Sequence, residues 1–216
     1  MSGSFVCYVG IAAVTGAFVG VHLWLDKKRR EALAAAAGRL GMRFAARGQG
    51  ALADGLAGHL PLFNRGSARN AVNAMFGKIE DVPVRILDYS FATGMRRHSS
   101  TQCQTVAAFG LGATRLPAFA LRPEGALSNL FGETDIEFKG HREFTRCYLL
   151  RGPDEPAIRT VFDDRVLAFF DANLGWSVET DGRWLIVYTS KRQVRPDDLP
   201  VFLEQAFGVF SVFGQA

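Results

Sequence analysis

The first pattern in the chain is an apolar run from Phe5 to Leu25 that contains no charged side chain. Its 21 positions would form a helix about 31 Å long, which matches the roughly 30 Å hydrocarbon core of a bilayer. An Asp, Lys or Arg at mid-span would cost about 2.5–3.5 kcal/mol. The run therefore predicts a single transmembrane helix at the amino terminus.

A basic cluster follows the run at once and predicts its orientation. The cluster consists of Lys27, Lys28, Arg29 and Arg30. Basic residues remain on the cytoplasmic side and attract anionic headgroups, so we expect the amino terminus outside and these four side chains at the membrane lipid. A cleaved signal peptide is the alternative, but its basic residues would precede the apolar run, and Met1 to Ser4 contain none.

Two glycines within the run suggest a contact between membrane helices. Gly16 and Gly20 are four residues apart, and small residues at this spacing let two helices approach closely. The spacing is consistent with a homodimer through the transmembrane helix. Glycine is also frequent in membrane helices that make no such contact, so both interpretations remain open.

Beyond the basic cluster the pattern predicts further helices and a set of strands. Helix-forming residues extend the first helix to Leu40, where Gly41 ends it, and the stretch 48–59 resembles a loose helix or a linker. Alternating or continuous apolar runs predict strands at 42–46, 70–79, 84–92, 101–111, 144–150, 176–180 and 183–189. Helices are expected at about 123–131, 154–175 and 198–213.

The connections indicate how these strands pair. Residues 80–83 suit a hairpin, and Asp181-Gly182 is the strongest hairpin signal in the chain. The strand after it is apolar on both faces and is therefore predicted to be central. We expect an α+β protein with a mostly antiparallel sheet and helices packed on one face. Residues 1–41 would form the anchor and juxtamembrane helix, and residues 42–216 a cytoplasmic domain.

Composition excludes several classes of function. The formal net charge is +4. Positions 26–31 contain four basic and two acidic residues, and the rest of the chain contains 21 basic and 19 acidic residues. A chain so close to neutral is not expected to bind nucleic acid, which needs many phosphate contacts. The three cysteines form no C-x-x-C pair, and free thiols suit a reducing cytosol.

No motif in the chain predicts catalysis or a cofactor. His98, Cys103, His141 and Cys147 are of the types that bind zinc, but their spacing matches no metal-ligand pattern. We therefore predict no catalytic residue, no metal and no cofactor. The loop with Arg96 and Arg97 is predicted to be solvated, and an anion or lipid headgroup is the ligand that it would contact. Asp135 and Glu137 would share the wet face of a strand.

Several aromatic and structural motifs carry a resemblance. They are Leu116-Pro-Ala-Phe-Ala-Leu-Arg-Pro-Glu124, Asp135-Ile-Glu-Phe138, Phe144-x-x-x-Tyr148-Leu-Leu-Arg-Gly152 and Arg159-x-x-Phe162. With them, the chain resembles uncharacterised bacterial proteins that pair an amino-terminal membrane helix with one α+β domain. The resemblance covers roughly residues 30–213 and implies a protein of the bacterial inner membrane, without site residues.

Three hypotheses for function follow from the sequence. The first is a membrane-anchored cytoplasmic domain that binds a protein or lipid partner without catalysis. The second is a membrane-tethered hydrolase or transferase, which requires His98, Asp135 and His141 to converge in one pocket. The third is an accessory subunit of a larger membrane complex.

Overall fold

The folded part of the protein is built on one antiparallel sheet. The computed structural model describes residues 2–48, 50, 52, 56–94, 99–125 and 135–214, with side chains from residue 20 onward except those of 57 and 59. Within them, eight strands form the sheet in the order β1-β2-β3-β4-β8-β7-β5-β6, with every neighbouring pair antiparallel. The strands are β1 Arg43–Arg47, β2 Ser67–Ile79, β3 Val82–Thr93, β4 Ser100–Gly110, β5 Phe119–Pro123, β6 Tyr148–Arg151, β7 Ser177–Thr180 and β8 Trp184–Tyr188. The predicted α+β class with an antiparallel sheet is confirmed.

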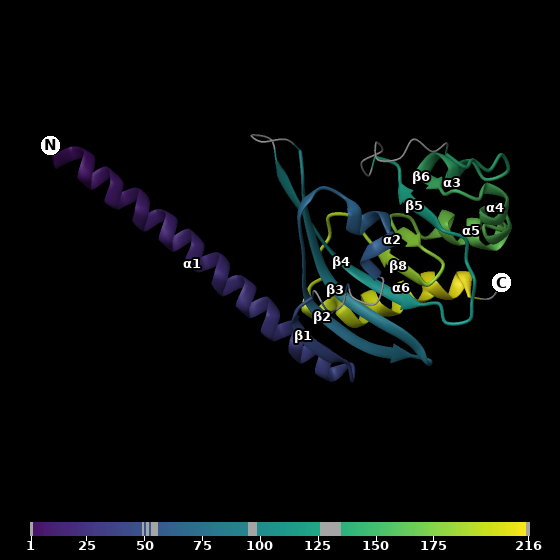
Figure 1. Ribbon diagram of the computed structural model, residues 1–216, viewed down its shortest axis with the longest axis horizontal. Helices are drawn as coiled ribbons and strands as arrows, with labels where there is room; N and C mark the ends of the chain where they lie inside the picture. Colours follow the sequence, from purple (N-terminus) through teal and green to yellow (C-terminus); the bar gives the residue numbers. More distant parts are fainter. Residues whose placement is uncertain are drawn as a thin grey trace.

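The helices differ in how they meet this sheet. They are α1 Ser2–Arg39, α2 Leu56–His59, α3 Arg142–Cys147, α4 Glu155–Val161, α5 Asp164–Ala172 and α6 Leu199–Phe213, with 3-10 turns η2 Pro61–Asn64 and η4 Pro196–Asp198. Helix α1 is a long rod that contacts the body with its carboxyl-terminal part and projects away from it at the other end (Figure 1). The remaining helices lie against the sheet.

Two apolar cores lie on opposite faces of the sheet, which corrects the prediction of helices on one face. Successive residues of β4 alternate between the cores, with Ala107 and Phe109 in the larger and Val106 and Ala108 in the smaller. Helices α1, α3, α4, α5 and α6 contribute to the larger core, and α2 and η2 to the smaller. Because the central strands are apolar on both faces, each face needs a cover.

The two predicted hairpins are present, and local chemistry explains both. Between β2 and β3 the turn is tighter than expected, since only Glu80 and Asp81 separate the strands, with φ of 48° and 68°. In the β7–β8 turn, Gly182 has a φ of 84°, and Asp181 Oδ1 accepts hydrogen bonds from the amides of Arg183 and Trp184 at 2.9 Å. Strand β8 lies between β4 and β7, so its predicted central position is confirmed.

Three predictions in the middle of the chain are wrong in detail. The sequence predicts that Pro123 opens a helix, but this residue ends β5, where it pairs with Tyr148 of β6. Glu124 and Gly125 form a turn, and residues 126–131 of that predicted helix lie outside the described residues. The predicted strand 144–150 begins only at Tyr148, because α3 occupies Arg142–Cys147 and buries Phe144 against the ring of Tyr148 at 5.4 Å. Asp135 and Glu137 lie in an irregular segment and not in a strand.

The predicted helix 154–175 is two helices. Helix α4 ends at Val161, and α5 begins after Asp163, whose Oδ1 accepts a hydrogen bond from Val166 N at 2.9 Å. Between them, Phe162 turns inward and meets the rings of Phe119 and Phe213, with centroids 5.0 and 5.6 Å apart. The side-chain cap at Asp163 satisfies a free amide at the start of α5, so the break costs little.

The predicted transmembrane helix falls in α1, whose backbone is helical from Ser2 to Arg39. The side chains of positions 5–19 lie outside the described residues. Among the residues that are described, no helix has both the length and the apolar character needed to cross a bilayer. The division of the chain at residue 41 remains a prediction, and the end of α1 packs into the larger core through Leu33, Ala36 and Ala37.

Candidate functional site at the junction of helix α1 and the sheet

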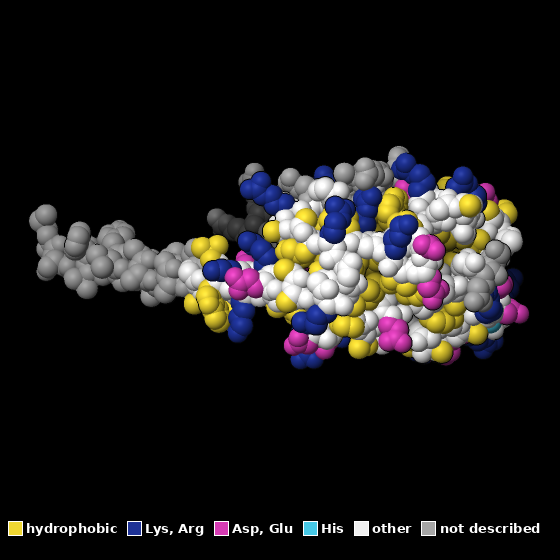
Figure 2. Space-filling view, turned by 90° about the horizontal axis from the view of Figure 1, so that it is seen from below, with side chains coloured by type: hydrophobic (Ala, Val, Ile, Leu, Met, Phe, Trp, Pro, Cys, Tyr) yellow, Lys and Arg dark blue, Asp and Glu magenta, His cyan; other side chains and the backbone are white. Residues whose placement is uncertain are grey.

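The exposure of α1 changes abruptly along its length. Leu33 is 1% exposed because it packs on the sheet. Toward the amino terminus the helix leaves the body and exposes large apolar side chains. These are Val21, Leu23, Trp24 and Leu25, with exposed fractions of 56, 64, 58 and 48%. Figure 2 shows apolar side chains on the projecting part of α1, beside basic and acidic ones.

Three of the four predicted headgroup contacts form a basic ring below these apolar side chains. Lys27, Lys28 and Arg30 are exposed. The ammonium of Lys28 lies 5.1 Å from the ring centroid of Trp24, and that of Lys27 lies 3.8 Å from Glu31 Oε1. We call Val21, Leu23, Trp24 and Leu25 the collar of α1, and Lys27, Lys28 and Arg30 its basic ring. Apolar side chains followed by basic ones suit a bilayer interface. Their contact with lipid remains a prediction.

Arg29, the fourth predicted headgroup contact, makes its described hydrogen bonds to the folded domain, and its contact with lipid remains a prediction. Its Nε and Nη2 donate to Asp88 Oδ2 and Oδ1 of β3 at 2.9 and 2.8 Å. Its Nη1 donates to the carbonyl oxygen of Val194 at 2.9 Å. The side chain is 21% exposed and that of Asp88 only 3%. Arg29 therefore points at the sheet and fixes α1 to it.

Asp88 is the centre of this polar cluster. Besides Arg29, its carboxylate accepts hydrogen bonds from Asn73 Nδ2 at 3.0 Å and Thr105 Oγ1 at 2.9 Å. Asn73 has a φ of 54° and lies at the irregularity in the β2–β3 pairing between Val72 and Met75. A bulge re-aims a side chain, and asparagine tolerates the left-handed conformation. The four donors compensate the buried charge.

The same cluster fastens the loop between β8 and α6. Thr105 Oγ1 accepts a hydrogen bond from Val194 N at 3.0 Å, and Thr105 N donates to the carbonyl of Arg192 at 3.0 Å. Helix, sheet and loop thus share one connected network of hydrogen bonds. We call Arg29, Asn73, Asp88, Thr105 and Val194 the α1 clamp. It gives the projecting helix a defined direction relative to the sheet.

A second buried polar cluster lies on the opposite face of the sheet. Glu179 of β7, which is fully buried, accepts hydrogen bonds from Arg122 Nη2 at 2.6 Å, Tyr188 OH at 2.8 Å and Leu62 N at 2.7 Å. Burial above all raises the pKa of Tyr188 well above its ordinary value. Burial opposes the charge of Arg122, but Glu179 and Tyr188 outweigh it and raise the pKa of Arg122. The cluster holds η2 on the sheet.

The polar residues proposed for catalysis have structural contacts where they are described. Asp135 Oδ1 accepts a hydrogen bond from Leu150 N at 2.8 Å, and burial raises the pKa of this carboxyl. His141 Nε2 lies 3.2 Å from Asp164 Oδ1. Arg96, Arg97 and His98 lie outside the described residues, so the anion contact and the three-residue pocket remain predictions.

The remaining candidates are the two described cysteines and the two glycines of the apolar run. Cys103 and Cys147 are half-buried free thiols, and burial followed by the charge of Asp88 raises the pKa of Cys103. Within the described residues no group of three or more His, Cys, Asp or Glu side chains is arranged to hold a metal ion. Gly20 is exposed, and a methyl group there would meet no atom within 4 Å. Gly16 lies among the residues whose side chains are not described, so the homodimer remains a prediction.

Sequence reasoning missed the α1 clamp. The available signal was Asp88, the single carboxylate in the strand from Val84 to Phe91, where it stands between the apolar residues Leu87 and Tyr89. A buried carboxylate requires a partner, and Arg29 is 59 positions away. No local pattern joins the two residues.

These features define an α+β domain that is fixed to a projecting helix with an apolar and basic collar. No family model matches the chain, and no curated protein matches it. One solved structure, the crystal structure of the mycobacterial trehalose monomycolate transport factor A, TtfA, is similar with a TM-score of 0.59. The identity is 14%, and the match covers 88% of this chain and 93% of that chain. At this identity the likeness shows a shared fold.

Proposed function

We propose that this protein is a membrane-anchored, non-enzymatic protein whose folded domain binds a lipid or protein partner at the cytoplasmic face of the bacterial inner membrane. The observation that carries the proposal is the collar of α1, where four large apolar side chains stand exposed directly before a basic ring. The α1 clamp begins at Arg29, within the same basic cluster.

Exposure of the four apolar side chains of the collar to water is unfavourable. Exposed apolar surface costs about 25 cal/mol per Å², so four such side chains on a single projecting helix favour burial in another apolar phase. The uncharged sequence from Phe5 continues the same helix away from the body. A bilayer would bury both segments, and the basic ring would place the folded domain on the cytoplasmic side.

The similar fold of TtfA supports a role related to lipid. TtfA is a mycobacterial trehalose monomycolate transport factor. A shared fold does not carry a function by itself, so its weight comes from agreement with the collar of α1. We infer that this protein takes part in the handling of a membrane lipid, either by binding it or by binding a protein that moves it.

Membrane attachment is tested in bacterial cells with the full chain carrying a carboxyl-terminal tag. The tagged protein should stay in the membrane pellet after carbonate extraction, and protease should digest the domain only after the cells are opened. Val14→Asp, which puts a charge into the apolar run, should move protein into the soluble fraction. Ala46→Asp, at an exposed position of β1, is the matched control and should not.

Two outcomes would overturn the proposal. Carbonate could release the intact unmodified chain, which would show that α1 is not embedded. Protease added to intact spheroplasts could digest the domain, which would place it on the other side of the membrane.

A further inference from the structure

Apart from α1, the large apolar side chains that the described residues expose are Leu174 and Val201. Leu174 lies in the turn after α5 and is 58% exposed, and Val201 lies in the first turn of α6 and is 55% exposed. The two residues are far apart in sequence, yet Val201 lines one of two adjoining hollows in the surface and Leu174 lines the other. The two hollows share four lining residues and together form one depression. The coincidence marks this depression as a place where an apolar ligand would bind.

The depression is a groove between α5 and α6 with an aromatic wall. It consists of two adjoining hollows of about 290 and 480 Å³ that share Trp176, Thr189, Arg192 and Gln205. The rings of Trp176 and Phe202 lie 6.0 Å apart at their centroids. Small-molecule sites typically measure about 300–1,000 Å³. The groove is therefore large enough for one hydrocarbon chain.

The charges at the groove favour an anionic ligand. Arg192 is exposed, and its guanidinium makes no hydrogen bond with any described residue. Asp198 also lines the groove, but Arg195 donates to it at 2.7 Å, and this hydrogen bond lowers the pKa of the Asp198 carboxyl. The charge of Arg192 also contributes to this lowering, but the hydrogen bonds that Asp198 accepts from a guanidinium come from Arg195, so the guanidinium of Arg192 can still bind a ligand. A phosphate or carboxylate suits an exposed guanidinium.

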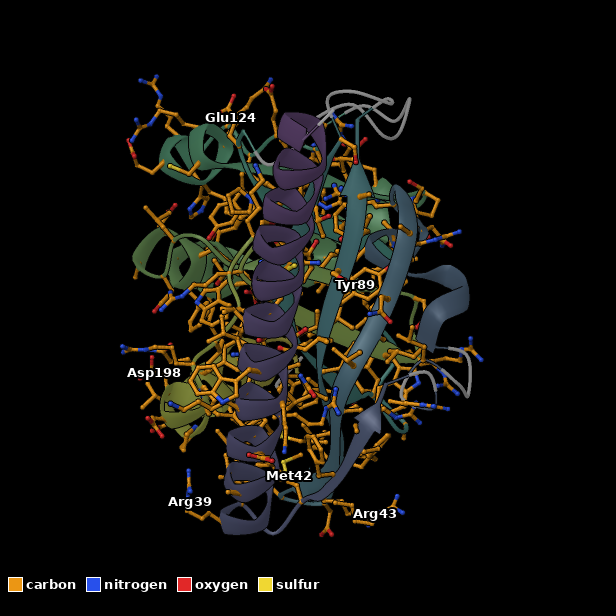
Figure 3. The ribbon with its side chains drawn as sticks, turned by 90° about the vertical axis from the view of Figure 1, so that its left-hand side faces the viewer. Arg39, Met42, Arg43, Tyr89, Glu124 and Asp198 are labelled. Atoms are coloured by element: carbon orange, nitrogen blue, oxygen red, sulfur yellow. The ribbon has the colours of Figure 1, made fainter. Side chains whose placement is uncertain are left out.

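The groove lies next to the point where α1 leaves the body. Val194 lines it, and the carbonyl of Val194 accepts the hydrogen bond from Arg29. Leu25 of the apolar collar precedes Arg29 by four residues, which is about 6 Å along a helix. Helix α1 contacts the η4 turn, whose last residue, Asp198, is labelled in Figure 3. A bilayer around the collar would therefore lie close to the groove.

We propose that the groove binds one acyl chain of an anionic lipid from the adjacent cytoplasmic leaflet, with the headgroup at Arg192 and the chain along Trp176, Leu174 and Val201. The proposal rests on the membrane anchoring proposed above. A lipid fits better than a protein partner, because a stable protein interface takes about 20–30 residues a side. This groove offers two exposed large apolar side chains and the guanidinium of Arg192.

The test uses the full chain in nanodiscs of phosphatidylcholine and phosphatidylglycerol. A small fraction of the phosphatidylglycerol carries a photoreactive group at the end of one acyl chain, and labelled peptides are mapped by mass spectrometry. A chain end that remains in the bilayer can label only α1. Labelling of residues 169–176 and 201–208 would show that the chain enters the groove. The labelling of α1 serves as the internal reference.

Substitutions separate the groove from general attraction to the bilayer. Arg192→Gln should reduce groove labelling about fivefold, since one cation near an anionic surface contributes about 1 kcal/mol. Lys78→Gln, which removes an exposed cation at the far end of β2, should leave it unchanged. Leu174→Ser with Val201→Ser should also reduce it, and the exposure of both side chains keeps the fold intact, as a thermal melt would verify.

The outcomes distinguish the two proposals. A chain that fails to enter nanodiscs would overturn the anchoring and the groove together. Stable insertion with labelling confined to α1 would overturn the groove alone. Equal groove labelling in Arg192→Gln and Lys78→Gln would overturn the anionic headgroup. A co-purified membrane protein that is lost from Leu174→Ser/Val201→Ser, without groove labelling by lipid, would assign the groove to a protein instead.

Discussion

Arg29 of α1 and Asp88 of β3 form a two-pronged ion pair, with Nε–Oδ2 and Nη2–Oδ1 distances of 2.9 and 2.8 Å. The pair connects the helix that leaves the domain to a strand inside the sheet. Because two hydrogen bonds run side by side, they fix the orientation of the guanidinium as well as its position. The direction of α1 relative to the sheet follows from this geometry.

The first prediction concerns this ion pair. Asp88→Asn should lower the free energy of unfolding by about 3 kcal/mol, because it leaves Arg29 partly buried without a counter-charge and places an NH2 donor where the carboxylate oxygen accepted hydrogen bonds. Chemical denaturation in mild detergent measures the change. Glu31→Gln, which breaks the exposed pair with Lys27, is the control and should have no measurable effect. Equal effects of both substitutions would contradict the assignment of Arg29.

A second prediction concerns Glu179. Glu179→Gln should cost about 3–5 kcal/mol, because Arg122 would stay buried without its counter-charge. Tyr188→Phe, which removes a single hydrogen bond to Glu179, should cost about 1 kcal/mol. Amide exchange at Leu62, whose N–H donates to Glu179, should become faster in Glu179→Gln. An unchanged exchange rate would show that another contact holds η2.

A third prediction concerns alkaline pH. Burial above all raises the pKa of both Tyr89 and Tyr148 from 10.0 to about 12. Above pH 10 the unfolded chain loses these protons before the folded chain does, so the free energy of unfolding should fall as pH rises. This contribution is fully present below pH 10 and is lost as pH passes about 12.

Denaturation at a series of pH values, together with tyrosinate absorbance, measures this effect. Tyr148→Phe should remove one late-titrating group, and it also removes the hydrogen bond that the Tyr148 hydroxyl donates to Asn173 O and the one that it accepts from Gly175 N. If every phenol of the folded protein ionised near its ordinary pKa, the assigned burial of Tyr89 and Tyr148 would be wrong.

A fourth prediction compares two glycines that have nearly the same positive φ. Gly66 and Gly112 have φ of 58° and 59°. A methyl group at Gly112 would meet no atom within 4 Å, whereas one at Gly66 would collide with the carbonyl oxygen of Ala92. Gly112→Ala should cost about 1 kcal/mol from strain, and Gly66→Ala a further 1–3 kcal/mol or so from the collision. Thermal melts of equal size for both variants would contradict the close approach of β2 and β3.

Local sequence chemistry predicted the parts of the fold that depend on near neighbours. Asp181 and Gly182 form the β7–β8 turn because the carboxylate caps nearby amides and the glycine accepts a positive φ. Helix α1 ends before Gly41, which has a φ of 67°. In both cases the deciding atoms lie within a few residues of each other, so sequence alone contains the information.

Other elements depended on contacts that no local pattern carries. The stripe of apolar residues after Asp154 is compatible with one helix or two, and the inward turn of Phe162 toward Phe119 and Phe213 selects two. The same holds for α3, where the stacking of Phe144 on Tyr148 selects a helix in place of the predicted strand. Propensity is a weak preference that tertiary packing overrides.

The sequence by itself determined the α+β class, the antiparallel hairpins, the central position of β8 and the apolar and basic collar of α1. Each follows from periodicity or from residues close together in the chain. Only the tertiary structure decided that Arg29 belongs to Asp88 and that Leu174 and Val201 share one groove. The physical reason is that a buried charge takes its partner from whatever the fold brings near it, and nothing in a linear pattern records that distance.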